Sequence, residues 1–207
     1  MSHLPERPRL GFFVSHRGSN MRAIFDACQD RRVRAEPALL ISNNKSSAAL
    51  AWAEEVCLSH INLCPTGAGS EEALDEAHLK ALQNADVDLI ILAGYMRKIG
   101  PLVLAAYANR ILNIHPALLP KYGGQGMYGH HVHDAVIAAR ETESGVTVHL
   151  VDGSYDTGPI VDQTTVPVES GDTAETLAAR VLKSEHSFFS ETLARIISGD
   201  IDLDSLR

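Results

Sequence analysis

Short apolar runs alternate with amphipathic segments along most of this chain, and that alternation limits its fold more than any other feature. The run Asp88–Ala93 reads DLIILA, a continuous apolar stretch typical of a strand covered on both faces. In segment 20–30, by contrast, Met21, Ile24, Phe25 and Cys28 recur at helical spacing. Strands that alternate with helices form βαβ units and a mostly parallel sheet. The sequence therefore predicts an α/β fold with a Rossmann-like, doubly wound sheet.

The same alternation predicts the order of the elements along the chain. Expected strands are 10–15, 38–42, 61–64, 88–93, 110–114, 146–151 and 160–168, the last two in an antiparallel arrangement. Expected helices are 20–30, 46–57, 71–84, 100–107, 130–140 and a long C-terminal helix at 173–197. With 207 residues and no internal linker, we expect a single domain over 1–207 that needs no disulfide or metal to fold.

Composition and charge limit the partners and the compartment. The net charge of −8 and the pI near 5.6, without a basic stripe, predict small-molecule ligands and no nucleic-acid partner. No stretch resembles a signal peptide or a membrane span, so we expect no membrane partner and a cytoplasmic location. The three cysteines contain no CxxC pair; we expect small buried residues, with a Cys57–Cys64 disulfide as the alternative. A monomer and a homodimer both remain open.

The segment 110–120 places two chemically capable side chains at the end of an apolar strand. Because side chains alternate along a strand, Leu112 and Ile114 should point into the packing while Asn113 and His115 share the other face. Farther along, the turn 151–160 carries Asp152 and Asp156 between two expected strands. An Asn, a His and an Asp brought together would stabilise an oxyanion and transfer protons.

The turn SHRGSN at 15–20 joins the first expected strand to the first helix. In α/β folds this position binds phosphate on free amide groups at the positive end of a helix. It matches neither a Walker loop nor a GxGxxG fingerprint, and an ordinary turn with Ser19 or Asn20 as the helix N-cap is the alternative.

Three motifs in order, SHRGSNMRAI, NIHPALLPKYGG and HLVDGSYDTGPIV, resemble the phosphoribosylglycinamide formyltransferase family over about Leu10 to Ile197. The resemblance implies the formyltransferase fold, with a nucleotide-binding half at 9–115 and a folate-binding half at 116–207. It implies transfer of a formyl group from the co-substrate 10-formyltetrahydrofolate to the amine of 5'-phosphoribosylglycinamide (GAR), in purine biosynthesis. GAR and the formyl-folate are then the two partners.

The resemblance also assigns residues to roles. Asn113, His115 and Asp156 are implied to be catalytic, with Asp156 rather than Asp152 as the acid. His149 either supports them or is a buried structural histidine. GAR binding is implied for Arg17, Gly18, Ser19, Asn20 and Glu185, and folate binding for Met96, Arg97, Ile99, Asn113, Val151 and Asp156. The chain departs from the family at His16, where glycine is usual and a positive φ would favour it.

Two further segments invite interpretation. Segment 121–129 holds four glycines and is expected to be a loop with freedom to act as a lid. His130, His131 and His133 suggest a metal site, but adjacent helix positions face different directions and we expect no carboxylate at ligand spacing. The sequence thus predicts no catalytic metal.

Three alternative functions remain. Formyltetrahydrofolate hydrolase shares the Asn-His-Asp centre but usually has an N-terminal regulatory domain, and methionyl-tRNA formyltransferase normally has a C-terminal nucleic-acid-binding domain. With the first strand at about Arg9 and the last residue at Arg207, we expect neither domain. A non-catalytic nucleotide sensor would predict a degraded centre, whereas the three expected catalytic residues are present.

Overall fold

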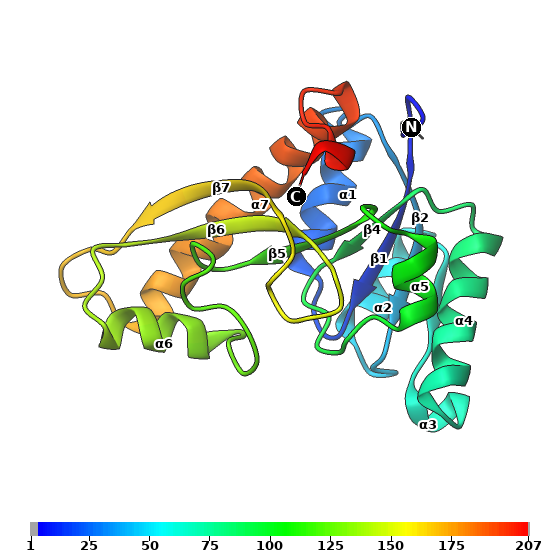
Figure 1. The fold of residues 1–207 in the computed structure, drawn as a ribbon, viewed down its shortest axis with the longest axis horizontal. Helices are drawn as coiled ribbons and strands as arrows, with labels where there is room; N and C mark the ends of the chain where they lie inside the picture. The colour runs from blue at the N-terminus through cyan, green and yellow to red at the C-terminus, as the bar shows by residue number, and fades with distance from the viewer. Residues whose placement is uncertain (1–3, 207) are drawn as a thin grey trace.

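A seven-stranded sheet runs through the computed structural model, which describes residues 4–206 (Figure 1). The strand order is β3-β2-β1-β4-β5-β6-β7. The first five strands are parallel, and β6 and β7 are antiparallel to their neighbours, as predicted. The strands are β1 Arg9–Val14, β2 Glu36–Ser42, β3 His60–Asn62, β4 Leu89–Leu92, β5 Ile111–His115, β6 Glu143–Leu150 and β7 Ile160–Pro167.

The helices agree with the predicted order. They are α1 Ser19–Gln29, α2 Ala48–Glu55, α3 Pro65–Ala68, α4 Glu71–Asn84, α5 Pro101–Ala106, α6 His130–Ala138 and α7 Ala174–Ser198, followed by a 3₁₀ turn at Leu203–Ser205. The long helix α7 begins at a capping box of Thr173 and Thr176 and ends at Gly199, whose φ is 85°. Neither α3 nor the 3₁₀ turn is predicted from the sequence, because segments of three or four residues show no periodicity.

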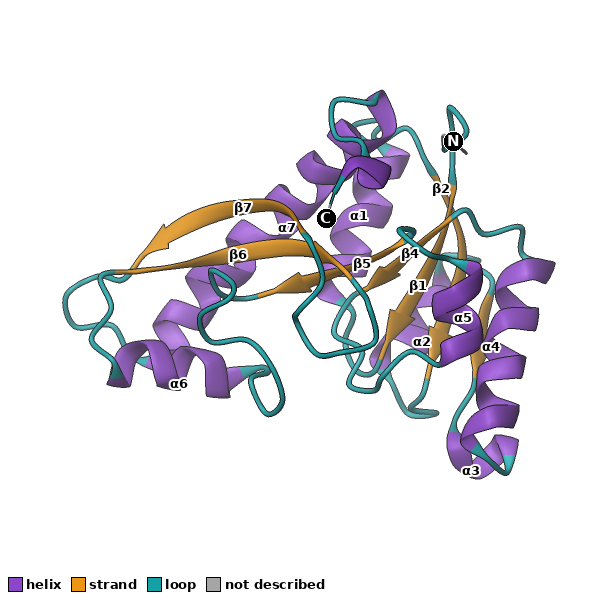
Figure 2. Cartoon of the chain, in the orientation of Figure 1, coloured by secondary structure: helices purple, strands orange, loops and turns teal. Residues whose placement is uncertain are grey.

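The sheet is buried on both faces by different helices. Phe12, Leu40 and Leu112 belong to one apolar cluster, which also takes in residues of α1, α2, α6 and α7. Their chain neighbours Phe13, Ile41 and Ile111 belong to the other, with residues of α4 and α5. Figure 2 shows these two layers, with α4 and α5 apart from α1 and α7. This arrangement confirms the doubly wound α/β class and explains why the strands are nearly all apolar.

The cysteines differ in part from expectation. All three are free, so the disulfide alternative is wrong for this structure. Cys57 is exposed at a turn with φ of 57°, and Cys28 and Cys64 are only half-buried, so the expectation of small buried residues does not hold. Burial raises the pKa of the Cys28 thiol to about 11.

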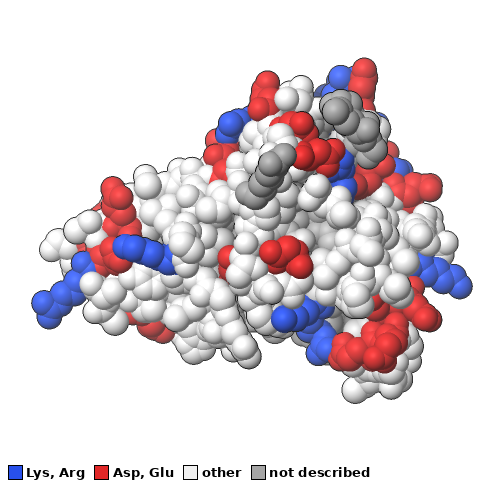
Figure 3. Space-filling model, viewed as in Figure 1, with Lys and Arg blue, Asp and Glu red and all other residues white. Residues whose placement is uncertain are grey.

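The surface carries charges of both signs. On the face drawn in Figure 3, the described residues form no continuous basic stripe, and acidic side chains gather around α3 and the start of α4. Among residues 4–206, no helix is long and apolar enough to cross a bilayer. The cytoplasmic location remains a prediction.

Candidate active site

Strand β5 presents Asn113 and His115 on the same face, as the alternation predicted. Leu112 and Ile114 are buried in the cluster that packs on α1 and α7. Strand β6 runs antiparallel beside β5 and sets His149 opposite Asn113 and Thr147 opposite His115. Two imidazoles and a carboxamide therefore lie on adjacent strands, β5 and β6, the fifth and sixth of the seven.

Asp156 lies between the two imidazoles. Its Oδ2 is 3.5 Å from His115 Nδ1, and its Oδ1 is 3.5 Å from His149 Nε2. The backbone amide of Gly124 donates to Oδ2 at 3.0 Å. The residue has a φ of 56°, a conformation in which aspartate is tolerated better than most residues. The structure thus brings Asn113, His115, His149 and Asp156 together from β5, β6 and the turn after β6.

Asp152, the competing carboxylate, has a different place. It is exposed and accepts hydrogen bonds from the Ser154 amide at 3.1 Å and from the Thr157 hydroxyl. These bonds within the segment are typical of an aspartate that stabilises a turn. Asp152 therefore shapes the turn that carries Asp156.

The hydrogen bonds of His115 fix its tautomer. The Nε2 atom lies 2.7 Å from the carbonyl oxygen of Tyr122, which can only accept, so Nε2 carries the proton. In the neutral ring, the lone pair of Nδ1 then faces Asp156. Burial lowers the pKa of His115, and the charge of Asp156 and the Tyr122 carbonyl only partly offset that effect. At neutral pH the ring is uncharged and can accept a proton at Nδ1.

Burial would raise the pKa of Asp156. The close approach of the His149 ring, the charge of His115 and the Gly124 amide outweigh that effect, so the pKa lies below its usual value. Asp156 is consequently an anion at neutral pH. A negative charge in this position stabilises a positive charge on His115.

Asn113 and His149 are hydrogen-bonded to each other. His149 Nδ1 lies 2.8 Å from the Leu150 carbonyl oxygen and must donate to it, so Nε2 accepts from Asn113 Nδ2 at 3.0 Å when the ring is neutral. The carboxamide is thereby oriented by its neighbour. Its second N–H remains for another acceptor, such as an oxyanion.

The loop between β1 and α1 has the features of an anion site. Gly18 is the N-cap of α1 with φ of 65° and ψ of 39°, and α1 has no side-chain cap. The alternative, an ordinary turn in which Ser19 or Asn20 caps the helix, is wrong in its cap, because both residues are already the first helical residues. Amides at this uncapped, positive helix end are suited to phosphate.

The neighbours of Gly18 explain why glycine is required there. A Cβ at Gly18 would lie 3.0 Å from the Met21 side chain and 3.1 Å from Val14, at a positive φ. His16 is not among the residues with positive φ, so its backbone tolerates histidine without strain. Arg17 and His16 are both exposed.

Glu185 is buried, although its helical periodicity alone favours a surface charge. Only 7% of it is exposed, and Asn20 Nδ2 donates to its Oε2 at 2.8 Å. Burial raises the pKa of this carboxyl to about 7. The other amide atom of Asn20, Oδ1, is also buried and has no hydrogen-bond partner among the described residues. Two residues assigned to GAR by resemblance are thus in direct contact.

The segment after β4 carries the residues assigned to the folate. Met96 is 42% exposed, whereas Ile99 is buried in the apolar cluster beneath α4 and α5, together with half-buried Val151. Arg97 forms an ion pair with Glu71. Met96 therefore offers an apolar contact at the surface, and Ile99 supports the segment from below.

Ser15 ties this segment to the loop after β1, a link that the sequence analysis missed. Its hydroxyl accepts from the Met96 amide at 2.8 Å and donates to Asn43 Oδ1 at 2.8 Å. Its own amide donates to the Gly94 carbonyl at 3.1 Å. The two loops that would hold different ligands are therefore one connected unit.

Four more contributors around His115 and Asp156 were missed. Two are backbone groups, the Tyr122 carbonyl and the Gly124 amide, which leave no signal in residue identity. Thr147 is buried opposite His115, and its hydroxyl donates to the Ala117 carbonyl and accepts from the Leu119 amide. His133 is buried, which lowers its pKa, and it lies close enough to His115 for the charge of His115 to lower that pKa further. A polar threonine between two valines was the one signal that the sequence offered.

The expectation that no carboxylate lies at ligand spacing from these histidines is wrong. His133 does turn away from its neighbours into the interior. Asp134, however, is a carboxylate at ligand spacing, and its oxygen lies within 4.8 Å of ring nitrogens of His130 and His131. Residues three and four positions apart share a helix face, which is why Asp134 lies beside the two histidines.

Comparison with known proteins shows which family the chain belongs to. The formyl transferase family profile matches residues 8–193. The chain belongs to the formyl transferase family. This formyl transferase is 39% identical over 196 residues to the chloroplastic phosphoribosylglycinamide formyltransferase of Arabidopsis thaliana, covering 94% of the chain and 67% of that protein. It is 32% identical to the phosphoribosylglycinamide formyltransferase of Escherichia coli K12, covering 92% of the chain and 87% of that protein.

A solved structure supports the same family. The glycinamide ribonucleotide transformylase 1 of Symbiobacterium toebii superposes on this formyl transferase with a TM-score of 0.87 at 36% identity. The match covers 94% of this chain and 89% of the other. The predicted formyltransferase fold is confirmed.

Proposed function

We propose that this chain transfers the formyl group of 10-formyltetrahydrofolate to the amine of GAR, releasing formyl-GAR and tetrahydrofolate in purine biosynthesis. The observation that carries the proposal is the position of Asp156 between His115 and His149, beside Asn113. Support comes from relatives named as phosphoribosylglycinamide formyltransferases over nearly the whole chain.

The proposed reaction begins with attack of the GAR amine on the formyl carbon. A new C–N bond forms, and the formyl oxygen gains negative charge in a tetrahedral intermediate. The free N–H of Asn113 is suited to hold that oxyanion. When the intermediate collapses, the bond from the formyl carbon to the folate N10 breaks, and a proton passes from the amine to that nitrogen.

Neutral His115 and ionised Asp156 divide the proton transfer. His115 Nδ1 accepts the proton of the attacking amine, directly or through water, and Asp156 stabilises the imidazolium that results. The proton then returns to the departing nitrogen. In the proposed reaction every such step uses a group of this chain, and we expect no catalytic metal.

The two halves of the chain are proposed to bind the two substrates. In the half 9–115, Gly18, Ser19 and Asn20 receive the GAR phosphate at the start of α1, and exposed Arg17 adds positive charge. From α7 in the other half, Glu185 contacts Asn20 and is proposed to bind the glycinamide end. The folate is proposed to lie between Met96, Arg97 and Ile99 on one side and Val151 to Asp156 on the other. That second wall belongs to the half 116–207.

A formyl-transfer assay tests the proposal. The purified chain is mixed with 10-formyltetrahydrofolate, and tetrahydrofolate release is followed by absorbance with and without GAR. Release that requires GAR and yields formyl-GAR supports the proposal. Release without GAR would instead indicate a hydrolase, and no release in either mixture would indicate a non-catalytic module.

A further inference from the structure

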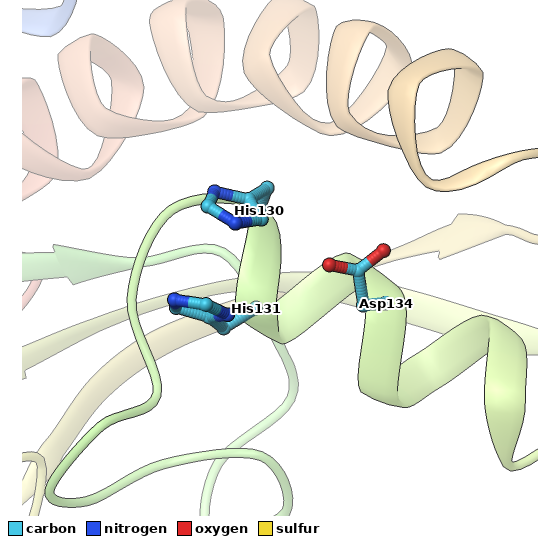
Figure 4. A group of neighbouring side chains, drawn as sticks. All are labelled: His130, His131 and Asp134. Atoms are coloured by element: carbon cyan, nitrogen blue, oxygen red, sulfur yellow. The ribbon is translucent and has the colours of Figure 1, made fainter.

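Three metal-ligating side chains gather at the first turn of α6, outside the proposed centre. Figure 4 shows the rings of His130 and His131 next to each other, with the carboxylate of Asp134 one turn along the helix. One ligand atom from each residue lies within 4.8 Å of the other two. All three residues are exposed.

Helix geometry explains the cluster. Asp134 follows His130 by four positions and His131 by three, so it lies on the same face as both. The two rings are tilted by 40° with centroids 4.1 Å apart, although the residues are adjacent. Tyr128 packs edge-on against His131 with a centroid distance of 5.3 Å, and this contact supports the ring.

We propose that His130, His131 and Asp134 bind one divalent transition-metal ion of the zinc type, with water completing a tetrahedral shell. Two imidazole nitrogens and a carboxylate oxygen are ligands that Zn²⁺, Co²⁺ and Ni²⁺ accept, whereas Mg²⁺ and Ca²⁺ require oxygen ligands. Tetrahedral zinc with bonds near 2.0 Å places its ligand atoms about 3.3 Å apart. Exposed side chains reach that spacing by small rotations from the spacing seen here.

The surroundings add charge of the favourable sign. Glu175, at the start of α7, lies close enough to His130 for their charges to interact. This carboxylate adds negative potential near the ion. The site is independent of the proposed transferase reaction, because none of its residues belongs to the Asn113, His115 and Asp156 group.

The test is a metal titration of the full chain without an affinity tag. The parent carries Cys57→Ser and Cys64→Ser, which removes one exposed and one half-buried thiol as competing ligands. Calorimetry with ZnCl₂ gives stoichiometry and affinity, and the visible absorption of added Co²⁺ reports its coordination. MgCl₂ serves as the hard-cation control. We expect one Zn²⁺ per chain and a four-coordinate Co²⁺ spectrum.

Variants locate the site. His130→Asn with His131→Asn, and Asp134→Asn separately, should weaken Zn²⁺ binding by at least the roughly 10- to 100-fold that loss of an outer-shell partner costs. His60→Asn, at another exposed histidine, should bind as the parent does. Circular dichroism checks that each variant is folded. The proposal is overturned if the parent shows no saturable Zn²⁺ binding or if the double histidine variant retains the parent affinity.

Discussion

Asn20 donates through Nδ2 to Glu185 Oε2 at 2.8 Å, joining the first turn of α1 to the middle of α7. Both side chains are largely buried, and the pKa of Glu185 is raised to about 7 because burial disfavours its charge. In the acid range the carboxyl is therefore neutral in the folded protein but ionised once the chain unfolds above its ordinary pKa of 4.5.

The first prediction concerns Glu185→Gln. The pKa of Glu185 is higher in the folded state than in the unfolded state. Its contribution to the free energy of unfolding is therefore fully present below about pH 4.5 and is lost as pH rises through about 7. Glutamine stays neutral and can still accept from Asn20. The variant should gain on the order of 3 kcal/mol relative to the wild type between pH 5 and pH 8. Urea denaturation across this range measures it; parallel stability curves would contradict the raised pKa.

The fold could be predicted from the sequence because burial on both faces leaves a visible pattern. A continuous apolar run such as Leu89–Leu92 is typical of a central strand. The helical periodicity sustained over Ala174–Ser198 is typical of a long helix. Cys57 was misjudged because its exposure follows from a turn with positive φ, which depends on neighbours that local composition does not reveal.

Only the side chains of the site, and not its backbone groups, could be predicted from the sequence. Asn113 and His115 follow from strand alternation, but the contact with Asp156 spans more than forty residues and depends on how β6 pairs with β5. The Tyr122 carbonyl and the Gly124 amide could not be predicted, because any residue type supplies the same backbone groups. Asp134 was missed for a simpler reason, since its helical spacing to two histidines was present in the sequence.

The second prediction concerns His115→Ala and His115→Gln. Glutamine can still donate to the Tyr122 carbonyl but has no atom that accepts a proton near neutral pH. Both variants should lose about 10²- to 10⁴-fold in kcat, the usual contribution of general acid–base catalysis. The Kd for GAR should change by less than the roughly tenfold that 1.4 kcal/mol represents. Single-turnover kinetics and calorimetry measure the two quantities.

A matched control for these variants is His60→Ala, which removes an exposed histidine far along the chain from β5. Its kcat should equal that of the wild type. If His115→Gln turned over near the wild-type rate, His115 would not carry the proposed proton transfer. That conclusion would hold whatever the effect of His115→Ala on folding.

The third prediction concerns Asp156→Asn. Asparagine can still accept from the Gly124 amide, so the turn keeps its hydrogen bond while the charge beside His115 disappears. Burial already lowers the pKa of His115, and the charge of Asp156 partly restores it. The pKa of His115 should therefore fall further in the variant. NMR titration of the His115 ring measures this shift, and a pKa that rises or stays constant would show that Asp156 does not act on the ring.

The fourth prediction tests how the turn holds Asp156 in place. A Cβ at Gly158 would lie 1.9 Å from the Leu150 carbonyl oxygen and 2.8 Å from its carbon, both backbone atoms at the end of β6. Gly158→Ala must therefore shift the segment that carries Asp156. We expect a loss of about 1–3 kcal/mol in the free energy of unfolding, as in other overpacked sites, together with a lower kcat.

Gly67→Ala provides the comparison for that variant, because its Cβ would meet only Cys64 Sγ at 3.5 Å, an ordinary contact. Gly67 lies in α3, where alanine is favoured over glycine by up to about 1 kcal/mol. This control should be as stable as the wild type or more so, with unchanged kcat. Urea denaturation and the formyl-transfer assay, both at temperatures below thermal unfolding, compare the stability and the turnover of the two variants. If Gly158→Ala matched Gly67→Ala in stability and turnover, the close approach to Leu150 would not be what positions Asp156.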